Sequence, residues 1–131
     1  MLSEDMRQVL IQKALEVRHM AYAPYSHYLV GAALLTASGK VFTGVNIENG
    51  AYPTTICAER VAVFKAVSEG ERVFEAIVAA TEDGGSPCGS CRQVLSEFGL
   101  DTLVLIVNQA GSITLEATVA ELLPGAFRLR A

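Results

Sequence analysis

Residues 76–108, AIVAATEDGGSPCGSCRQVLSEFGLDTLVLIVN, decide the fold. The two ends of this stretch, AIVAAT at 76–81 and LVLIVN at 103–108, are short and almost wholly apolar, which is typical of strands buried on both faces. Between them, residues 89–98 have the pattern of a helix. Because apolar strands separated by helices favour parallel pairing with both faces covered, the stretch predicts an α/β fold.

The segments that precede this stretch add a helix and a hairpin. Ser3 is placed to cap a helix that ends before the loop YAPYS at 22–26. The apolar residues of this helix recur at helical spacing and are Met6, Val9, Leu10 and Val17. YLVGAALLT (28–36) and VFTGV (41–45) predict two antiparallel strands, since a Ser-Gly turn joins them.

A second helix is predicted to start near Cys57 and to stop at Gly70, with Val61, Phe64 and Val67 facing inward. After the opening stretch, SITLEA (112–117) predicts an edge strand and VAELLP (119–124) a final helical turn. These elements together predict a three-layer α/β/α sandwich around a mixed five-stranded sheet. The 131 residues suit one core, so we expect a single domain over residues 1–131.

Composition excludes several classes of partner. The net charge is -4, the pI is about 5.1, and no run of lysine and arginine occurs, which argues against binding of a nucleic-acid backbone. The apolar runs are far shorter than the roughly 20 residues that cross a bilayer, so no membrane span is expected. The odd number of cysteines and the polar start of the chain favour a reduced, cytoplasmic protein that acts on a small molecule.

The three cysteines are the strongest chemical signal. Cys88 and Cys91 lie one helical turn apart at the start of one predicted helix, and Cys57 lies at the start of another. Helix amino ends favour negative charge and therefore thiolates, which are good zinc ligands. Glu59 stands two residues after Cys57. Three protein ligands leave one position of zinc open to water, and a nearby carboxylate that is not a ligand can move protons.

Other interpretations of the cysteines remain open at this point. A Cys-x-x-Cys pair can be a redox pair, although such a pair needs no third cysteine. Cys57 alone can be a buried apolar residue. A structural zinc would need a fourth protein ligand, and Glu59 would then have to bind the metal.

The chain resembles the small, homotetrameric cytidine deaminases that act on free nucleosides. The resemblance covers nearly the whole chain and is carried by the motifs YAPYSHYLVGAAL, GVNIENGAYPTTICAER, AVSEGE, SPCGSCRQVLSEFG and ELLPGAF. Cysteine in the CAE motif marks the branch with three thiolate ligands, whereas larger relatives have histidine at the position of Cys57. The combination of three zinc ligands with a non-ligating glutamate is the known pattern of zinc deaminases.

The resemblance implies a reaction and its central residues. One Zn²⁺ would be held by Cys57, Cys88 and Cys91, with water as the fourth ligand. Glu59 would carry protons during the conversion of cytidine or deoxycytidine to uridine or deoxyuridine and ammonia. This reaction is a step of pyrimidine salvage. Three thiolates leave the divalent metal with an excess negative charge, and Arg60 would offset it by donating hydrogen bonds to the thiolates. Arg92 would play a supporting part near Cys91.

The resemblance also implies a substrate site. Asn46 and Glu48 alternate along an extended segment, so they would face the same side and bind the ribose hydroxyls. Tyr28 would lie beside the base, where relatives commonly have phenylalanine, and its added hydroxyl needs a partner. Ala58 would also contact the substrate. Two aromatic residues would reach sites of neighbouring subunits in a homotetramer, namely Tyr52 and Phe127.

Three rival functions share parts of this pattern. A deaminase of a nucleoside antibiotic such as blasticidin would have the same zinc core, but the NIE and CAER motifs favour a nucleoside. Polynucleotide deaminases need a basic channel or a stacking platform, which this acidic chain does not indicate. A binding module with a structural zinc, or an inactive nucleoside sensor, would retain metal and release no ammonia.

Overall fold

The computed structural model describes residues 2–129, which form one sheet and its covering helices. In chain order the elements are α1 (Glu4–Val17), the 3₁₀ turn η1 (Arg18–Met20), β1 (Gly31–Thr36), β2 (Val41–Val45), the 3₁₀ turn η2 (Tyr52–Thr54), α2 (Ala58–Ser68), β3 (Phe74–Ala80), α3 (Gly89–Glu97), β4 (Leu103–Val107), β5 (Ile113–Thr118) and α4 (Val119–Leu122).

The sheet is mixed, and its order among the described residues is β2-β1-β3-β4-β5. β1 pairs antiparallel with both β2 and β3, whereas β3 and β4 are parallel and β5 closes the edge antiparallel to β4. The prediction of a parallel pair from AIVAAT and LVLIVN is therefore confirmed, as is the edge strand. The first strand is shorter than predicted, because β1 begins at Gly31 and not at Tyr28.

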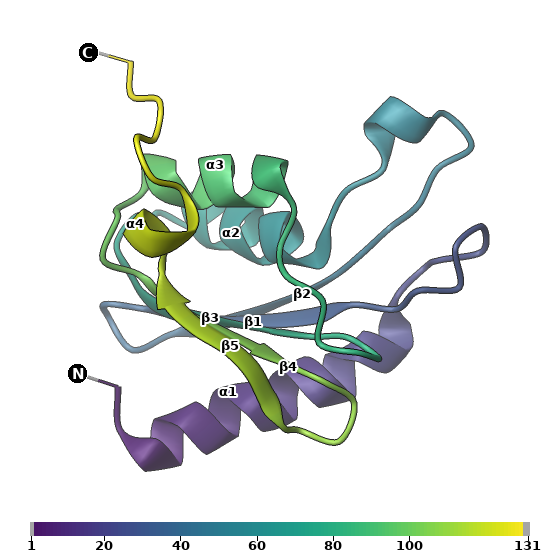
Figure 1. Ribbon diagram of the computed structural model, residues 1–131, viewed down its shortest axis with the longest axis horizontal. Coiled ribbons are helices and arrows are strands. Elements are labelled where there is room, and N and C mark those ends of the chain that lie inside the picture. The colour runs from purple at the N-terminus through teal and green to yellow at the C-terminus, as the bar shows by residue number, and fades with distance from the viewer. Residues whose placement is uncertain (1, 130–131) are drawn as a thin grey trace.

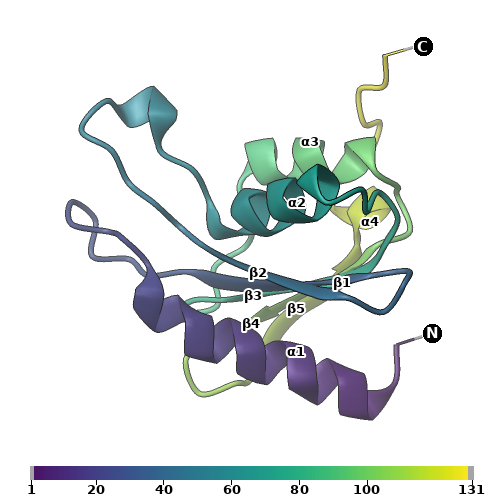
Figure 2. The same cartoon turned by 180° about the vertical axis from the view of Figure 1, so that it is seen from behind.

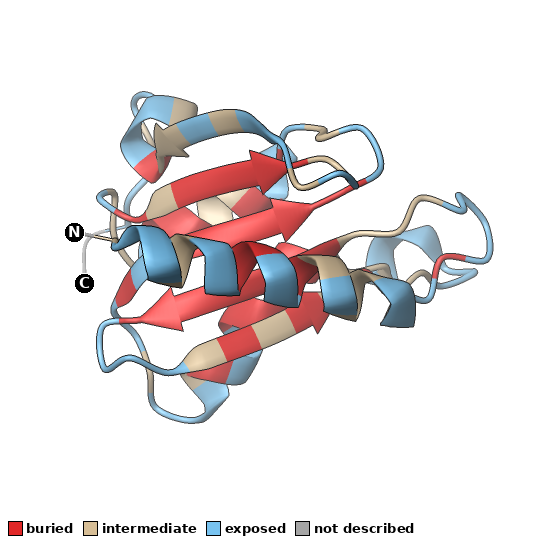
Figure 3. Cartoon of the chain, turned by 90° about the horizontal axis from the view of Figure 1, so that it is seen from below, coloured by how far each residue is buried: buried red, intermediate tan, exposed pale blue. Residues whose placement is uncertain are grey.

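Helices cover both faces of the sheet, as the three-layer prediction requires. Figure 1 shows α2, α3 and α4 on one face and α1 on the other, and the reverse view in Figure 2 agrees. Seen from the side of α1, the central strands are buried under this helix (Figure 3). Every residue of β1 is buried, which accounts for the continuous apolar run of this strand.

The inward faces of the helices differ in part from the prediction. In α1 the buried residues are Leu10, Ile11 and Ala14, while Val9 is 42% exposed. In α2 the predicted inward position of Phe64 is wrong, since this side chain is 45% exposed. The apolar residues that α2 buries are mostly small and are Ala58, Ala62, Val63 and Ala66.

Small residues allow the helices to lie very close to the sheet. A Cβ atom added at Gly44 of β2 would lie 2.4 Å from the carbonyl oxygen of Ala58 in α2. On the opposite face, a Cβ atom at Gly31 of β1 would lie 2.2 Å from the carbonyl oxygen of Ala14 in α1. Both distances are shorter than any real contact, so glycine is required at each position for this packing.

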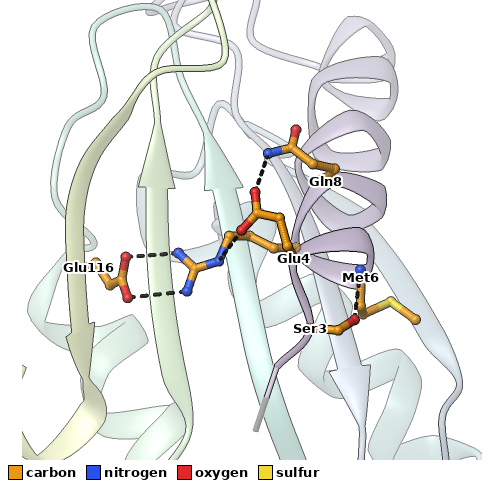
Figure 4. A network of polar contacts seen from close by, with 6 residues as sticks. Ser3, Glu4, Met6, Gln8 and Glu116 are labelled. Carbon is orange, nitrogen blue, oxygen red and sulfur yellow. Dashed lines mark hydrogen bonds and ion pairs between the residues drawn. The ribbon is translucent and has the colours of Figure 1, made fainter.

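Polar contacts fix the start of α1 against the far edge of the sheet (Figure 4). The Ser3 side chain accepts a hydrogen bond from the Met6 N–H at 3.1 Å, which confirms the predicted cap. Arg7 donates two hydrogen bonds to the Glu116 carboxylate of β5, at 2.8 and 3.3 Å. The bidentate pair joins the first helix to the last strand. Across residues 2–129, no helix has both the length and the apolar character to cross a membrane.

Candidate metal centre and active site

Two helices begin at the same end of the sheet. α2 follows β2 and α3 follows β3, and both strands run opposite to β1, which lies between them. The two strands therefore point in the same direction, although β1 separates them in the sheet. Their helices start near the carboxyl ends of these strands, where open α/β sheets commonly bind ligands.

Cys57 and Cys88 are the N-cap residues of α2 and α3, and Cys91 lies in the first turn of α3. Within the described chain, neither N-cap cysteine uses its side chain to cap its own helix, whereas Ser3 and Thr118 do so for α1 and α4. The thiols of these cysteines are therefore available to another partner.

The three sulfur atoms converge on one point. Cys57 Sγ lies 3.8 Å from Cys88 Sγ, which lies 3.4 Å from Cys91 Sγ, and all three are free thiols within 4.8 Å of one another. Ligands held tetrahedrally at about 2.3 Å from zinc lie about 3.8 Å apart, so the spacing fits this metal. Among residues 2–129, Glu59 is not part of this ligand group. The convergence of a third thiol also argues against an isolated redox pair.

Charge and hydrogen bonding around the sulfurs favour the thiolate of Cys57. Arg60 Nη2 donates a hydrogen bond to Cys57 Sγ at 3.2 Å, as expected from the sequence. Hydrogen bonding from the Cys91 thiol and from Arg60 lowers the pKa of Cys57 to about 5. In the same cluster, the hydrogen bond to Cys57 and burial raise the pKa of Cys91. The buried Arg60 Nε has no partner among the described residues, so this guanidinium keeps a donor beside the cluster.

Glu59 lies in the first turn of α2 and is 7% exposed. Burial raises the pKa of its carboxyl, with a smaller contribution from the charge of Cys57. A raised pKa makes the carboxyl a stronger base than an exposed glutamate, which suits a group that accepts and donates protons. Its position in the first turn of α2, two residues after Cys57, is compatible with a proton carrier, and this role stays a prediction.

A cavity of about 310 Å³ opens beside the sulfurs. Cys57, Cys88 and Glu59 form part of its wall. Three more predicted site residues also line it, namely Tyr28, Asn46 and Glu48. The cavity therefore brings together residues from the loops before β1 and after β2 with the starts of both helices.

Comparison with known proteins gives a consistent result. Residues 4–107 match the family model described as the cytidine and deoxycytidylate deaminase zinc-binding region. The chain belongs to this deaminase family.

Individual relatives support the same assignment. The chain is 54% identical over 124 residues to a cytidine deaminase of Halalkalibacterium halodurans, covering 92% of this chain and 93% of the relative. The crystal structure of a cytidine deaminase from Burkholderia pseudomallei superposes with a TM-score of 0.88 at 42% identity, covering 96% of this chain and all of the other. A blasticidin-S deaminase of Bacillus cereus is 34% identical over 125 residues, with 88% and 87% of the two chains covered.

As in the zinc-binding region that defines the deaminase family, the three cysteines of this chain form a site suited to one zinc ion. The protein is a zinc-dependent hydrolase of this family.

Asn46 and Glu48 face the cavity, as their alternation predicted, but both also hold the chain before β1. Asn46 Oδ1 accepts a hydrogen bond from the Val30 N–H at 2.9 Å, and its Nδ2 donates to the Tyr28 carbonyl at 2.8 Å. The Glu48 carboxylate accepts hydrogen bonds from the N–H groups of residues 25–26, at 3.0 and 3.1 Å. Each side chain therefore reaches the cavity from a fixed position.

Three predicted substrate contacts do not line the cavity within the described chain, and they differ in burial. Ala58 is fully buried beside Glu59 at the start of α2. Tyr52 is 78% exposed and Phe127 is 69% exposed, and within the described chain neither lines this cavity. The single chain therefore does not bring these two aromatic residues to its own site.

Four hydrogen bonds, made by two side chains, were not predicted from the sequence. The Tyr28 hydroxyl, whose partner was unknown, donates a hydrogen bond to Asp83 Oδ1 at 2.6 Å. Arg92 donates to the Pro87 carbonyl at 2.9 Å, to Ser86 Oγ at 2.6 Å and to the Leu122 carbonyl at 2.7 Å. The donors of Arg92 bind the loop before Cys88 and the end of α4, and its supporting part near Cys91 stays a prediction.

Proposed function

We propose that this chain catalyses the hydrolytic deamination of cytidine and deoxycytidine to uridine and deoxyuridine, with release of ammonia, in pyrimidine salvage. The observation that carries the proposal is the convergence of three thiols from two helix starts beside a buried glutamate that is outside the ligand group. Membership of the deaminase family and the 54% identity to a cytidine deaminase support it.

In this proposal Cys57, Cys88 and Cys91 hold the zinc ion. When bound, zinc lowers the pKa of water at its open position and so makes a nucleophile available near neutral pH. Glu59 accepts a proton from the attacking water and delivers it to N3 of the cytosine ring, which makes C4 electrophilic. After the hydroxide of that water adds to C4, Glu59 accepts the remaining proton of the new hydroxyl and passes it to the amine. The C4–N bond then breaks, ammonia departs and the C4 carbonyl of uridine remains. Arg60 stabilises the thiolate of Cys57 throughout.

The cavity wall suits an uncharged nucleoside. Among the described residues, those that line the cavity include Glu48 and Glu59 but no lysine or arginine, so a phosphate group would find no cation there. We propose that Asn46 and Glu48 bind the ribose hydroxyls and that the ring of Tyr28 lies beside the base, with Ala58 also in contact. The cavity of about 310 Å³ is at the lower end of the usual range for small-molecule sites.

We further propose that residues 1–131 act as one domain within a homotetramer. The high exposure of Tyr52 and Phe127 in the single chain supports the idea that each completes the site of a neighbouring subunit. Three free thiols without a disulfide also support a reducing, cytoplasmic location.

The test is turnover of purified, zinc-loaded protein with cytidine, deoxycytidine, cytosine, adenosine and blasticidin S, followed by ultraviolet absorbance and ammonia release. We expect activity on the first two substrates. Glu59→Gln is expected to retain zinc and to lower kcat by about 10²- to 10⁴-fold, because the proton carrier is lost. The control is Glu69→Gln at the exposed end of the same helix, with kcat unchanged.

Two results would contradict the proposal. One zinc per chain without ammonia release would indicate a binding module with structural metal. Turnover of blasticidin S that greatly exceeds turnover of cytidine would move the function to the antibiotic, as in the Bacillus cereus relative.

A further inference from the structure

The loop between β3 and α3, residues 81–87, forms one wall of the cavity. Thr81, Gly85, Ser86 and Pro87 all line the cavity, and the loop leads directly into Cys88. The position of this loop therefore sets the shape of the space in which a substrate would lie.

The Tyr28 side chain faces this loop across the cavity wall. Its hydroxyl donates a hydrogen bond to Asp83 Oδ1 at 2.6 Å, and within residues 2–129 Asp83 does not itself line the cavity. Tyr28 therefore lines the cavity while its hydroxyl is held by a residue of the loop.

The loop around Asp83 is tightly organised. Thr81 Oγ1 accepts hydrogen bonds from the N–H groups of Gly84 and Gly85, at 2.7 and 3.0 Å. A Cβ atom at Gly85 would lie only 2.9 Å from the Tyr28 hydroxyl oxygen. The hydroxyl is thus enclosed between Asp83 and the backbone of Gly85. Burial and the hydrogen bond to Asp83 raise the pKa of Tyr28, so the hydroxyl remains a donor at neutral pH.

Other contacts hold the rest of the loop independently. Thr114 Oγ1 of β5 donates a hydrogen bond to the Gly84 carbonyl at 2.9 Å. Arg92 donates to Ser86 Oγ and to the Pro87 carbonyl, just before Cys88. Loss of the Tyr28–Asp83 bond would therefore leave the loop folded and the metal ligands in place. Its effect would be confined to the wall of the cavity that Tyr28 shares with Gly85.

We propose that Tyr28 and Asp83 form a positioning pair that fixes the ring of Tyr28 and the adjacent wall for binding of the pyrimidine nucleoside. Asp83 is the positioning residue, since it acts on the substrate only through Tyr28. The inference rests on the proposed function and assigns to the hydroxyl of Tyr28 a structural contact that does not involve the substrate.

The test is a double-mutant cycle with steady-state kinetics on cytidine. Tyr28→Phe and Asp83→Ala are each expected to raise KM about three- to tenfold, with kcat within about twofold of the parent and zinc content unchanged. The double variant is expected to be no worse than either single variant, because both remove the same bond. Asp83→Asn keeps an acceptor oxygen and is expected to restore most of the affinity. Glu82→Ala, which removes a neighbouring exposed charge, is the matched control.

A second pair of variants tests the close approach. Gly85→Ala is expected to raise KM more than Tyr28→Phe does, because the added methyl group would press on the hydroxyl oxygen. In the Tyr28→Phe background, where this oxygen is absent, the same substitution is expected to have a much smaller effect. Reciprocal compensation of this kind would not arise if the two residues acted separately.

The failure of this inference is distinct from failure of the proposed function. If the parent protein deaminates cytidine while Tyr28→Phe and Asp83→Ala leave KM unchanged, or add independently, the positioning pair is refuted. If the parent has no activity, the proposed function fails. The hydrogen bond between Tyr28 and Asp83 can then still be tested by measuring the pKa of Tyr28 in an ultraviolet titration. Asp83→Ala should then lower the pKa of Tyr28, measured by difference from Tyr28→Phe. An unchanged pKa would overturn the pairing.

Discussion

Gly44→Ala should damage the metal centre from a distance, because Gly44 determines how closely α2 approaches the sheet. The added Cβ atom would lie 2.4 Å from the Ala58 carbonyl oxygen and 2.6 Å from the Ala62 nitrogen, both of which are backbone atoms of α2. Ordinary contact begins at 3.4 Å, so the start of α2 must move by about 1.0 Å or the strand must bend. Cys57 and Glu59 would move with the helix.

The expected magnitudes follow from this displacement. Overpacking of this kind commonly costs about 1–3 kcal/mol of unfolding free energy. A displacement of about 1 Å in a catalytic group can lower the rate by about 100-fold. We therefore expect Gly44→Ala to fold with reduced stability, to bind zinc more weakly and to lose about two orders of magnitude in kcat/KM.

The assay combines urea unfolding, zinc content and turnover, with Gly31→Ala as the matched control. At Gly31 the added atom would press on α1, on the opposite face of the sheet from the cysteines. This control should lose comparable stability and retain zinc. Two results would refute the reasoning that the distance between α2 and the sheet controls the metal centre. One is a Gly44→Ala variant with the zinc affinity and turnover of the parent, and the other is an equal loss of zinc from both variants.

Further predictions concern single contacts. Arg60→Ala should weaken zinc binding by about 10- to 100-fold, measured by competition with a chelator, because the hydrogen bond to a ligand sulfur is lost. Arg92→Ala should do the same to a smaller extent, since it releases the loop before Cys88. Removal of metal should lower the unfolding temperature of the parent but leave that of Cys91→Ser unchanged. Hydrogen bonding from its arginine partner lowers the pKa of Glu116 below the usual 4.5, so the folded protein binds fewer protons there than the unfolded chain. Glu116→Gln should thus cost stability at neutral pH, with the difference vanishing as the pH falls below 4.5 through the folded pKa; a difference that persists in acid would contradict this.

The sheet and the metal centre were predictable because their signals are local. The two apolar runs of the opening stretch became β3 and β4, since continuous apolar strands need cover on both faces. The cysteines could be assigned to helix starts from their spacing. Their convergence follows from the common direction of β2 and β3, even though β1 separates these strands.

The helix faces were less predictable because hydrophobicity does not report how closely two elements approach. Phe64 is more apolar than Ala62, and yet α2 buries Ala62 and exposes Phe64. The backbone contact above Gly44 leaves room only for small side chains at this interface. Small residues do not stand out in an apolar pattern, so this interface has no clear periodic signal.

The contacts of Tyr28 with Asp83 and of Arg92 with Leu122 could not be predicted because they join distant segments. Tyr28 and Asp83 are 55 positions apart, and the loop that carries Asp83 has no periodic pattern. The available signal was the tyrosine itself, whose hydroxyl required a partner wherever the ring was placed. For Arg92 the adjacent cysteine suggested a role near the sulfur, whereas its donors bind two acceptors in the loop just before its helix and one at the distant end of α4.

The cysteines at the two N-cap positions serve metal binding at the expense of helix stability. Serine or aspartate at position 57 or 88 would close its helix with a side-chain hydrogen bond, as Ser3 does elsewhere in the chain. A library of variants ranked by thermal stability in the absence of metal would therefore favour such replacements. The selected variants would lack a zinc ligand and would lose activity. Engineering for robustness has to be carried out on the zinc-loaded protein, where thiolate ligation offsets the missing caps.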